Sequence, residues 1–199
     1  MRRVVIDNGH GIDTLGKMSP DGQLREYLWN RQVAELIIDG LINAGVDAEL
    51  LVPETNDIPL STRVRRINKV CSDIGAANVI LVSVHVNAAG NGDWINAQGW
   101  SAYTCKGRTK SDSLAECLYD AAEKEFSDRR IRRDMSDGDR DWESDFYILK
   151  KSSCPAVLTE NFFMDNKDDA AFLLSDEGKK RCAKVHIEGI LSYLGKADE

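Results

Sequence analysis

The sequence contains no long apolar run, which limits the classes of protein it can belong to. No stretch approaches the roughly 18 apolar residues that a membrane-spanning helix needs. The N-terminal MRRVVID has only three apolar residues before its aspartate, whereas a signal peptide needs roughly 7–15. We therefore expect neither a membrane span nor a signal peptide.

The sequence also lacks a cysteine pattern and an excess of positive charge. The five cysteines are odd in number and widely spaced, without a C-x-x-C pair, which argues against a disulfide framework or a structural zinc knuckle. Lysine and arginine total 26 against 33 aspartates and glutamates, a net charge of −7. A nucleic-acid-binding domain needs cationic surface to displace phosphate counterions, so we expect no nucleic-acid partner.

The sequence instead shows alternating apolar strands and amphipathic helices. Strands are expected at 4–6, 46–52, 78–85, 99–105, 146–149 and 156–160, and helices at 23–44, 59–74, 111–126, 170–174 and 177–194. This alternation predicts an α/β fold with a mostly parallel twisted sheet and helices on both faces. The length of 199 residues suits a single domain spanning 1–199. The charged segment 128–145 is expected to be a solvated loop or rim.

Three predicted strands end in side chains that can bind a metal or move a proton. The first leads to His10, the third ends at His85, and the last ends at Glu160. Functional residues of open α/β sheets gather at the carboxyl edge, and Glu26 lies at the start of the helix just beyond His10. Two histidines and one carboxylate are typical of an open zinc site, and the other carboxylate would act on the bound water. The residues alone leave open which carboxylate binds the metal.

Each of these residues also has a structural interpretation. His85 on an apolar strand fits a hydrogen-bonded core histidine, and Glu26 fits a favourable charge at a helix N-terminus. Glu160 is harder to explain structurally, because a carboxylate that follows an apolar strand is costly to bury without a partner. His186, inside an amphipathic helix, is expected to be structural.

Four motifs occur in one order: VVIDNGHG, LREYLW, ILVSVHVNA and AVLTENFFMDN. Together they resemble the zinc-dependent N-acetylmuramoyl-L-alanine amidases of the type 3 group, which includes bacterial cell-wall amidases and phage endolysins. The resemblance extends from Val4 to about Leu194. It implies one Zn²⁺ ion held by His10, Glu26 and His85, with Glu160 as the catalytic residue.

The resemblance also implies a reaction. The substrate would be peptidoglycan or a muropeptide, cleaved at the amide between the lactyl group of N-acetylmuramic acid and L-alanine of the stem peptide. Zinc would lower the pKa of its water to about 7 and polarise the lactyl carbonyl. Glu160 would take the proton of that water and return it to the departing amine.

Other residues are assigned supporting roles. Asp7 is predicted to orient the ring of His10 through its free N–H. Asn87 and Trp94, which follow His85, are predicted to contact substrate, Trp94 by stacking on a sugar. Arg132 and Arg133 could meet stem-peptide carboxylates, although a solvated loop is the favoured interpretation of their segment.

The sequence departs from the family pattern at two places. Asn8 stands where the family usually has proline, which affects the loop more than the chemistry. Asn161, Phe162 and Phe163 follow Glu160, where the family usually has a glycine and then a phenylalanine. We expect this bulk to narrow or reshape the leaving-group side. No long inhibitory insertion is visible, so we expect an open site.

Three alternative functions remain. A zinc carboxypeptidase-like peptidase acting on wall peptides would use the same four groups. A wall-binding module without catalysis would not need Glu160. A cysteine hydrolase would pair Cys71, Cys105 or Cys154 with a histidine, but no known Cys–His spacing is present.

The absence of a signal peptide bears on where the protein acts. It fits a chain made in the cytoplasm that reaches the cell wall by phage-type release or another export route, or a trimmed segment of a longer protein. The sequence carries no indication of oligomeric state.

Overall fold

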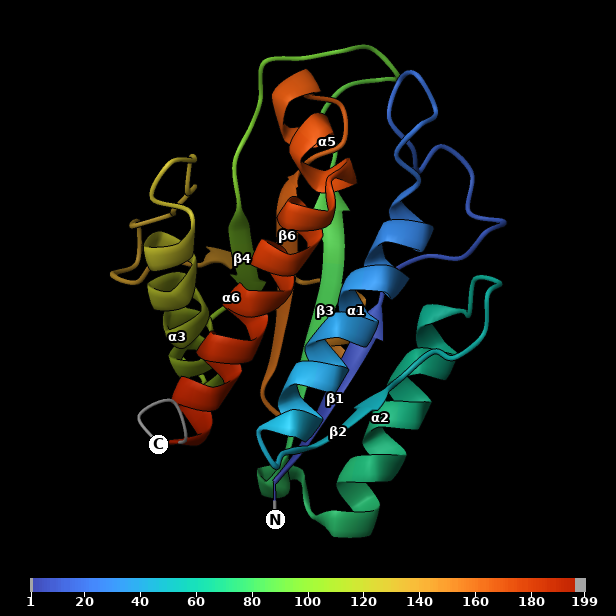
Figure 1. The fold of residues 1–199 in the computed structure, drawn as a ribbon. Coiled ribbons are helices and arrows are strands. Elements are labelled where there is room, and N and C mark those ends of the chain that lie inside the picture. The colour runs from blue at the N-terminus through green and yellow to red at the C-terminus, as the bar shows by residue number, and fades with distance from the viewer. Residues whose placement is uncertain (1, 196–199) are drawn as a thin grey trace.

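Six strands form one sheet in the order β2-β1-β3-β6-β4-β5 in the computed structural model, which describes residues 2–195 (Figure 1). The strands β1, β2, β3 and β6 run parallel, whereas β4 runs antiparallel to β6. Edge strand β5 pairs parallel with β4. The bounds are β1 (Arg3–Asn8), β2 (Asp47–Leu50), β3 (Val79–Asn87), β4 (Ser101–Thr104), β5 (Trp142–Glu143) and β6 (Ala156–Phe163).

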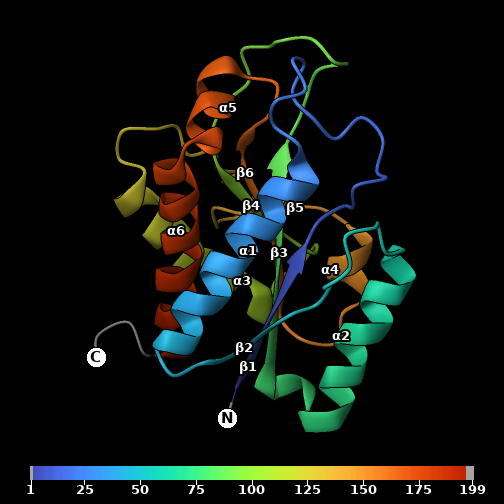
Figure 2. The same ribbon diagram turned by 45° about the vertical axis from the view of Figure 1, so that its right-hand side comes forward.

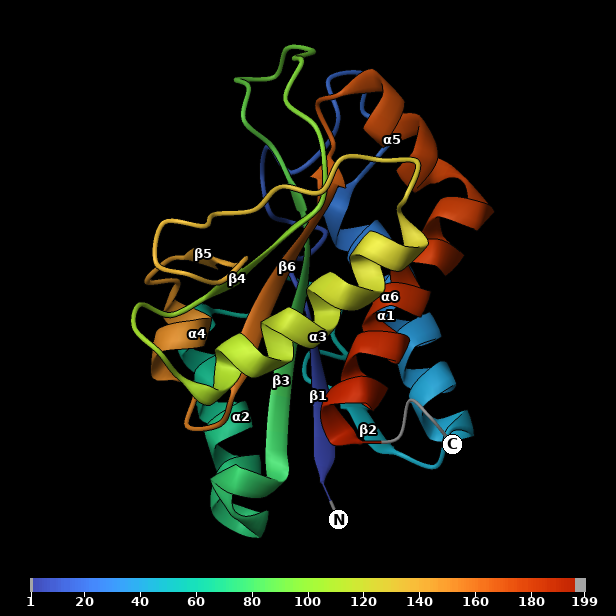
Figure 3. The same ribbon diagram turned by 90° about the vertical axis from the view of Figure 1, so that its left-hand side faces the viewer.

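Helices cover both faces of this sheet (Figures 2 and 3). One layer contains α1 (Glu26–Asn43), α3 (Lys110–Glu125), α5 (Lys167–Leu174) and α6 (Asp176–Leu194). The other contains α2 (Leu60–Ile74) and the short α4 (Tyr147–Lys151), and a 3₁₀ turn, η1 (Ala76–Asn78), precedes β3. The prediction of a mostly parallel α/β domain with helices on both faces is confirmed.

The two faces of the sheet explain why its central strands read as continuous apolar runs. In β1, Val4 and Ile6 join the core under α1, α3 and α6, whereas Val5 joins the core under α2 and α4. Strands buried on both sides need apolar residues at every position. Strict alternation then places Asp7, Ser83 and His85 on the α2 side of the sheet.

One predicted element was wrong in type, and others differ in extent, such as α5, which begins at Lys167 rather than at 170. Most of the stretch 146–149, expected to be a strand, belongs to α4, which buries Ile148 and Leu149 and leaves Tyr147 exposed; Phe146, just before the helix, is also exposed. So short an apolar run does not distinguish a strand from a helical turn. The first helix begins at Glu26 rather than at residue 23, because residues 18–25 form a turn in which the Ser19 amide donates to the Leu24 carbonyl and the Leu24 amide donates to Ser19 Oγ.

The charged segment 128–145 is only partly solvated. Asp141 is almost fully buried, and Arg140 forms ion pairs with Glu116 and Asp120 of α3. The prediction of a wholly solvated loop is therefore wrong for its C-terminal part. The segment is fixed because its charges of mixed sign pair with the adjacent helix.

The remaining buried polar groups have structural roles. His186 lies within hydrogen-bond distance of Thr159 Oγ1 (2.8 Å) and the Cys182 carbonyl (2.7 Å), and burial lowers its pKa to about 4. Its predicted structural role is confirmed. All five cysteines lie among the described residues and are free thiols.

The ends of the described chain lie together at the side of the domain opposite the carboxyl ends of β1 and β3 (Figure 1). The Arg2 guanidinium lies over the ring of Tyr193, 5.9 Å from its centroid. Within residues 2–195, no helix combines the length and apolar character needed to cross a bilayer.

The packing of α6 against α3 depends on the absence of a side chain at Gly189. A Cβ there would lie 2.8 Å from the Cα of Leu118, a backbone atom that cannot move aside. We expect Gly189→Ala to lower the free energy of unfolding by about 1–3 kcal/mol, because overpacking exceeds the gain of about 0.5–1 kcal/mol in helix propensity. Urea denaturation of metal-loaded protein measures this.

Gly40→Ala provides the matched control. Its Cβ would meet the flexible tip of the Ile187 side chain, which can rotate away. The change should be within about 0.5 kcal/mol of neutral. Equal losses in both variants would contradict the assigned role of Gly189.

Candidate active site

The loop after β1 is held in a strained shape that presents His10. His10 has φ of 63°, in the left-handed region that non-glycine residues rarely adopt. Its carbonyl accepts hydrogen bonds from Arg31 (3.0 Å) and Arg63 (3.4 Å). The adjacent Gly11 must lack a side chain, because a Cβ would lie 1.9 Å from the Asp57 backbone nitrogen. Contacts from α1 and α2 thus fix His10.

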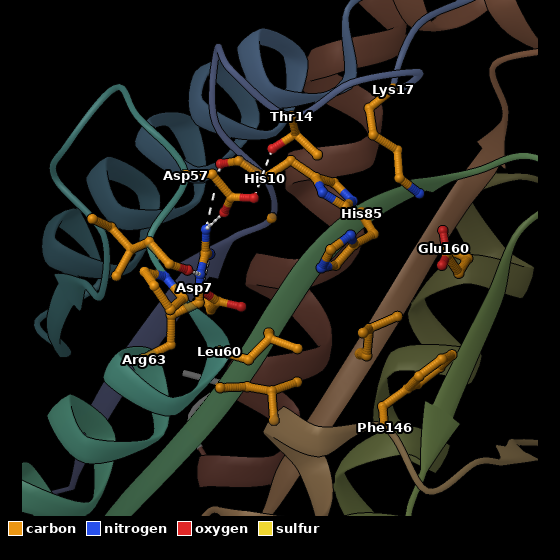
Figure 4. A pocket seen from close by; sticks show the side chains of 15 residues that line it. Asp7, His10, Thr14, Lys17, Asp57, Leu60, Arg63, His85, Phe146 and Glu160 are labelled. Carbon is orange, nitrogen blue, oxygen red and sulfur yellow. Dashed lines mark hydrogen bonds and ion pairs between the residues drawn. The ribbon is translucent and has the colours of Figure 1, made fainter.

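His10, Glu26 and His85 converge from three separate elements. Glu26 is the first residue of α1, and its Oε1 lies 3.4 Å from His10 Nε2 and 3.1 Å from His85 Nδ1. The ligand atoms of the three residues lie within 4.8 Å of one another. The imidazole rings meet edge to face, with centroids 5.0 Å apart, and both point into one space (Figure 4). The predicted convergence of these residues is therefore present.

The electrostatics of this cluster keep Glu26 ionised. Burial by itself would raise the pKa of Glu26, but hydrogen bonds and charge from His10 and His85 hold it well below its usual range. The pKa of His85 is raised because its interaction with Glu26 outweighs the opposing effect of burial. A buried carboxylate between two imidazoles thus provides one negative charge that a cation can neutralise.

The donor set fits a zinc ion. Two imidazole nitrogens and one carboxylate oxygen are ligands that zinc prefers at open sites. The second oxygen of Glu26, Oε2, lies 4.0 Å from the Lys17 ammonium but is buried without a hydrogen-bond partner among residues 2–195, which leaves an acceptor for a metal ion. Gly9 also keeps the space clear, because a Cβ there would lie 2.1 Å from the His85 ring.

Glu160 lies beside this cluster because of the strand register. It is paired with His85 in the parallel β3–β6 ladder, so both side chains emerge on the same face. Burial, with a further contribution from the Glu26 charge, raises the pKa of Glu160 to about 7. Its Oε2 has no hydrogen-bond partner in the described chain. A carboxylate with this pKa suits proton transfer near neutral pH.

The cluster opens into a cavity of ≈ 410 Å³ with two unlike walls (Figure 4). One wall carries His10, His85 and Lys17. The opposite wall is apolar and contains Ile58, Leu60, Phe146, Ile148 and Leu158. This arrangement can hold an uncharged or amphipathic group beside the reactive carboxylate.

Arg63 holds the end of β1 and the loop that follows it, and it was not among the residues predicted from the sequence. Its guanidinium is 2% exposed and donates to Asp7 Oδ1 (2.6 Å) and to the Asn8 carbonyl (2.9 Å). Ser83 donates to the other Asp7 oxygen (2.6 Å). The available signal was the position of Arg63 within the apolar stripe of α2.

This arrangement corrects the interpretation of Asp7. Both oxygens of the Asp7 carboxylate are occupied by Arg63 and Ser83 rather than by the ring of His10. Asp7 acts on His10 indirectly, through the guanidinium that donates to the His10 carbonyl. The physical reason is the permanent charge and the several N–H donors of the buried guanidinium, which make Arg63 a strong partner for a carboxylate.

Asn87 and Trp94 lie outside the cavity, so their substrate contacts stay predictions. The Asn87 side-chain oxygen accepts a hydrogen bond from the Ala88 amide (2.8 Å). Trp94 lines a separate hollow of ≈ 380 Å³, where the Lys167 ammonium lies 5.8 Å from its ring centroid. Neither residue is brought to the metal cluster.

The arginines of the charged segment have defined surroundings. The Arg132 guanidinium lies over the rings of Trp142 and Phe163, at 5.0 and 5.1 Å from their centroids. Its positive charge lowers the pKa of Glu160, which partly opposes the larger rise that burial causes. Arg133 pairs with Glu123. Contacts between these arginines and a stem peptide stay predictions.

Asn161, Phe162 and Phe163 do not line the cavity, and their effect on the leaving-group side stays a prediction. Asn161 donates to the His85 carbonyl (3.0 Å) and accepts from Trp100 (3.0 Å). Phe162 adopts φ of 63° and packs in the opposite core against Phe126 and Phe172. The register shift between β3 and β6 redirects these side chains away from the cavity.

The role of Arg63 predicts a large effect from a conservative change. Arg63→Lys keeps the charge but loses the planar set of donors that reaches Asp7, Asn8 and His10. We expect unfolding free energy to fall by about 3 kcal/mol and metal affinity to weaken. Chemical denaturation and metal titration measure these effects. Arg66→Lys, on the same helix but half-exposed with Glu54, should change stability by less than about 1 kcal/mol.

Comparison with known proteins agrees with the geometry. The family model described as N-acetylmuramoyl-L-alanine amidase matches residues 4–192. An endolysin of Bacillus phage SPP1 is 34% identical over 199 residues, covering 96% of this chain. An N-acetylmuramoyl-L-alanine amidase, CwlM of Bacillus licheniformis, is 27% identical and also covers 96% of the chain. The chain spans 65% and 68% of the lengths of these two relatives.

Solved structures show the same fold. An N-acetylmuramoyl-L-alanine amidase from Clostridium difficile 630 superposes with a TM-score of 0.81 at 27% identity, covering 98% of this chain and 97% of that one. AmiC2 of Nostoc punctiforme gives 0.81 at 26% identity, with the same coverages of 98% and 97%. With nearly the whole length matched by the family model, the chain belongs to the N-acetylmuramoyl-L-alanine amidase family.

Proposed function

We propose that this chain is a zinc-dependent peptidoglycan amidase that cleaves the bond between the lactyl group of N-acetylmuramic acid and L-alanine of the stem peptide. The observation that carries the proposal is the convergence of His10, Glu26 and His85 beside the unpartnered carboxylate of Glu160. Membership of the amidase family supports the same reaction. Residues 1–199 would form one catalytic domain, acting on the cell wall or on its fragments.

The metal and the protein would divide the chemistry. A zinc ion bound by His10, Glu26 and His85 would lower the pKa of a water to about 7 and polarise the substrate carbonyl. Glu160 accepts the proton of the attacking water, because its carboxylate lies beside the metal ligands and has an oxygen without a hydrogen-bond partner in the described chain. The protonated Glu160 then donates to the departing amine.

The lining of the cavity suits a substrate in which an acyl group is joined to a peptide. The apolar wall formed by residues such as Leu60 and Phe146 suits the methyl groups of a lactyl and alanyl segment. His10 and His85 keep side-chain exposures of 19% and 17%, so substrate can reach the cluster. This supports the expectation of an open site.

A carboxypeptidase-like reaction on wall peptides is the second candidate. Such an enzyme needs a cation to hold the terminal carboxylate of its substrate. Lys17 lines the cavity, and its side chain is 41% exposed. The product identifies the reaction, because an amidase frees the amino group of L-alanine, whereas a carboxypeptidase releases a C-terminal amino acid.

Metal removal should abolish the activity. We expect a chelator to stop release of stem peptides with L-alanine N-termini from purified wall, and stoichiometric zinc to restore it. Mass spectrometry of the digest and metal analysis of the protein measure both. Release of C-terminal residues instead would favour the peptidase, and activity that survives complete removal of the metal would contradict the proposal.

Replacement of the base should separate binding from turnover. Glu160→Gln should retain zinc and lose about 100-fold or more in kcat, because the amide cannot accept a proton. Glu35→Gln, an exposed change on α1, should leave both unchanged. Activity near the wild-type level in Glu160→Gln would remove Glu160 from this role.

The pH dependence has a defined sign. Only ionised Glu160 acts as base, so wild-type kcat/KM should fall as pH drops through the pKa of Glu160. That pKa is about 7 without metal, and a bound dication would lower it.

In chelated protein the raised pKa of Glu160 makes its ionised form unfavourable in the folded state. Stability should therefore decline as pH rises towards 7, and Glu160→Gln should remove this decline.

A further inference from the structure

A second group of carboxylates lies away from the cavity, at the end of the charged segment. Aspartates alternate in Asp137-Gly138-Asp139-Arg140-Asp141, directly before β5. Figure 3 shows the chain between α3 and β5 passing along the β4–β5 edge of the sheet. Aspartates at alternate positions are also the first ligands of calcium-binding loops.

Asp141 carries the independent observation. It is 1% exposed, and only one of its oxygens has a partner: Oδ2 accepts from Thr104 Oγ1 at 2.6 Å. The other oxygen, Oδ1, is buried and has no hydrogen-bond partner in residues 2–195. Asp139 Oδ1 is likewise buried and has no hydrogen-bond partner among these residues. Burying unpartnered carboxylate oxygens is costly unless a positive charge meets them.

The surrounding charges do not supply that compensation. Burial and the nearby charges of Asp139 and Asp112 raise the pKa of Asp141 to about 7. Arg140, between the two aspartates, directs its guanidinium to α3, where it pairs with Glu116 and Asp120. Arg108 lies beside Gly138, but among the described residues no lysine or arginine forms an ion pair with Asp139 or Asp141.

We propose that Asp139 and Asp141 bind a hard divalent cation of the calcium type, at a site separate from the zinc cluster. The available side-chain ligands are oxygens, which calcium prefers, whereas zinc favours nitrogen and sulfur. Asp139 and Asp141 are the two side-chain ligands of this site, and backbone carbonyls and water would supply the remaining ligands.

The site would fix one wall of the catalytic cavity. Asp141 is anchored to β4 through Thr104 and leads directly into β5. The chain then reaches Phe146, which lines the cavity. A bound cation would hold this edge of the sheet in place, so it would raise stability without taking part in the reaction. The inference does not depend on the proposed amidase activity.

Calcium binding to the zinc-loaded protein tests the site directly. Calorimetric titration should show one saturable calcium event, and the same calcium should raise Tm. Asp141→Asn should abolish this event, and Asp139→Asn should weaken it by roughly tenfold or more. Asp93→Asn removes the same charge from an exposed loop and should leave it unchanged. Circular dichroism and zinc content verify the fold of each variant.

Terbium locates the cation. Excitation through tryptophan should give terbium emission that calcium quenches by competition, because Trp142 is adjacent to Asp141. Trp142→Phe should lose most of this emission while keeping the calorimetric calcium event. Unchanged emission in Trp142→Phe would place the ion elsewhere and overturn the assignment.

The proposal has two further outcomes that would overturn it. One is the absence of saturable calcium binding in the wild type. In that case Asp139 and Asp141 would be a carboxyl pair that shares a proton and binds no cation. The other is calcium binding of equal strength in the wild type and Asp139→Asn. Asp139 is partly exposed, so this variant remains decisive if Asp141→Asn fails to fold.

Discussion

The buried ion pair between Arg63 and Asp7 is the interaction on which the catalytic edge depends. The arginine reaches from α2 to the end of β1, and its donors also meet the carbonyls of Asn8 and His10. A buried pair of this kind contributes little net stability compared with an apolar replacement, but losing one partner is costly. Its value here is geometric, because it holds a strained histidine loop against the sheet.

Glu26 and Glu160 lie side by side, yet their pKa values are shifted in opposite directions. Glu26 lies between two imidazoles, which outweigh its burial and keep it ionised. Glu160 has no such partner, so burial dominates and its proton is held more strongly. A ligand for a cation must be ionised, whereas a group that moves protons needs a pKa near the working pH. The hydrogen-bond partners of each residue therefore separate their roles.

The sequence was sufficient to predict the parts of the site that depend on parallel strands. His10, His85 and Glu160 each follow an apolar strand, and parallel strands bring their carboxyl ends to one edge. The contacts of Arg63 were not predictable, because they join residues about 55 positions apart that share no local pattern. The orientation of Phe162 was also hidden, since it depends on a register shift that only pairing with β3 produces.

The neighbouring chain ends, marked by Arg2 over Tyr193, have a consequence for protein engineering. A short peptide could join them, and the backbone could then be opened in an exposed loop such as 105–109, giving a circular permutant with the same sheet. A partner attached next to Arg2 or Tyr193 would extend from the side facing away from the catalytic cavity. Substrates as large as a polymer network would then approach the cavity without meeting the fused module.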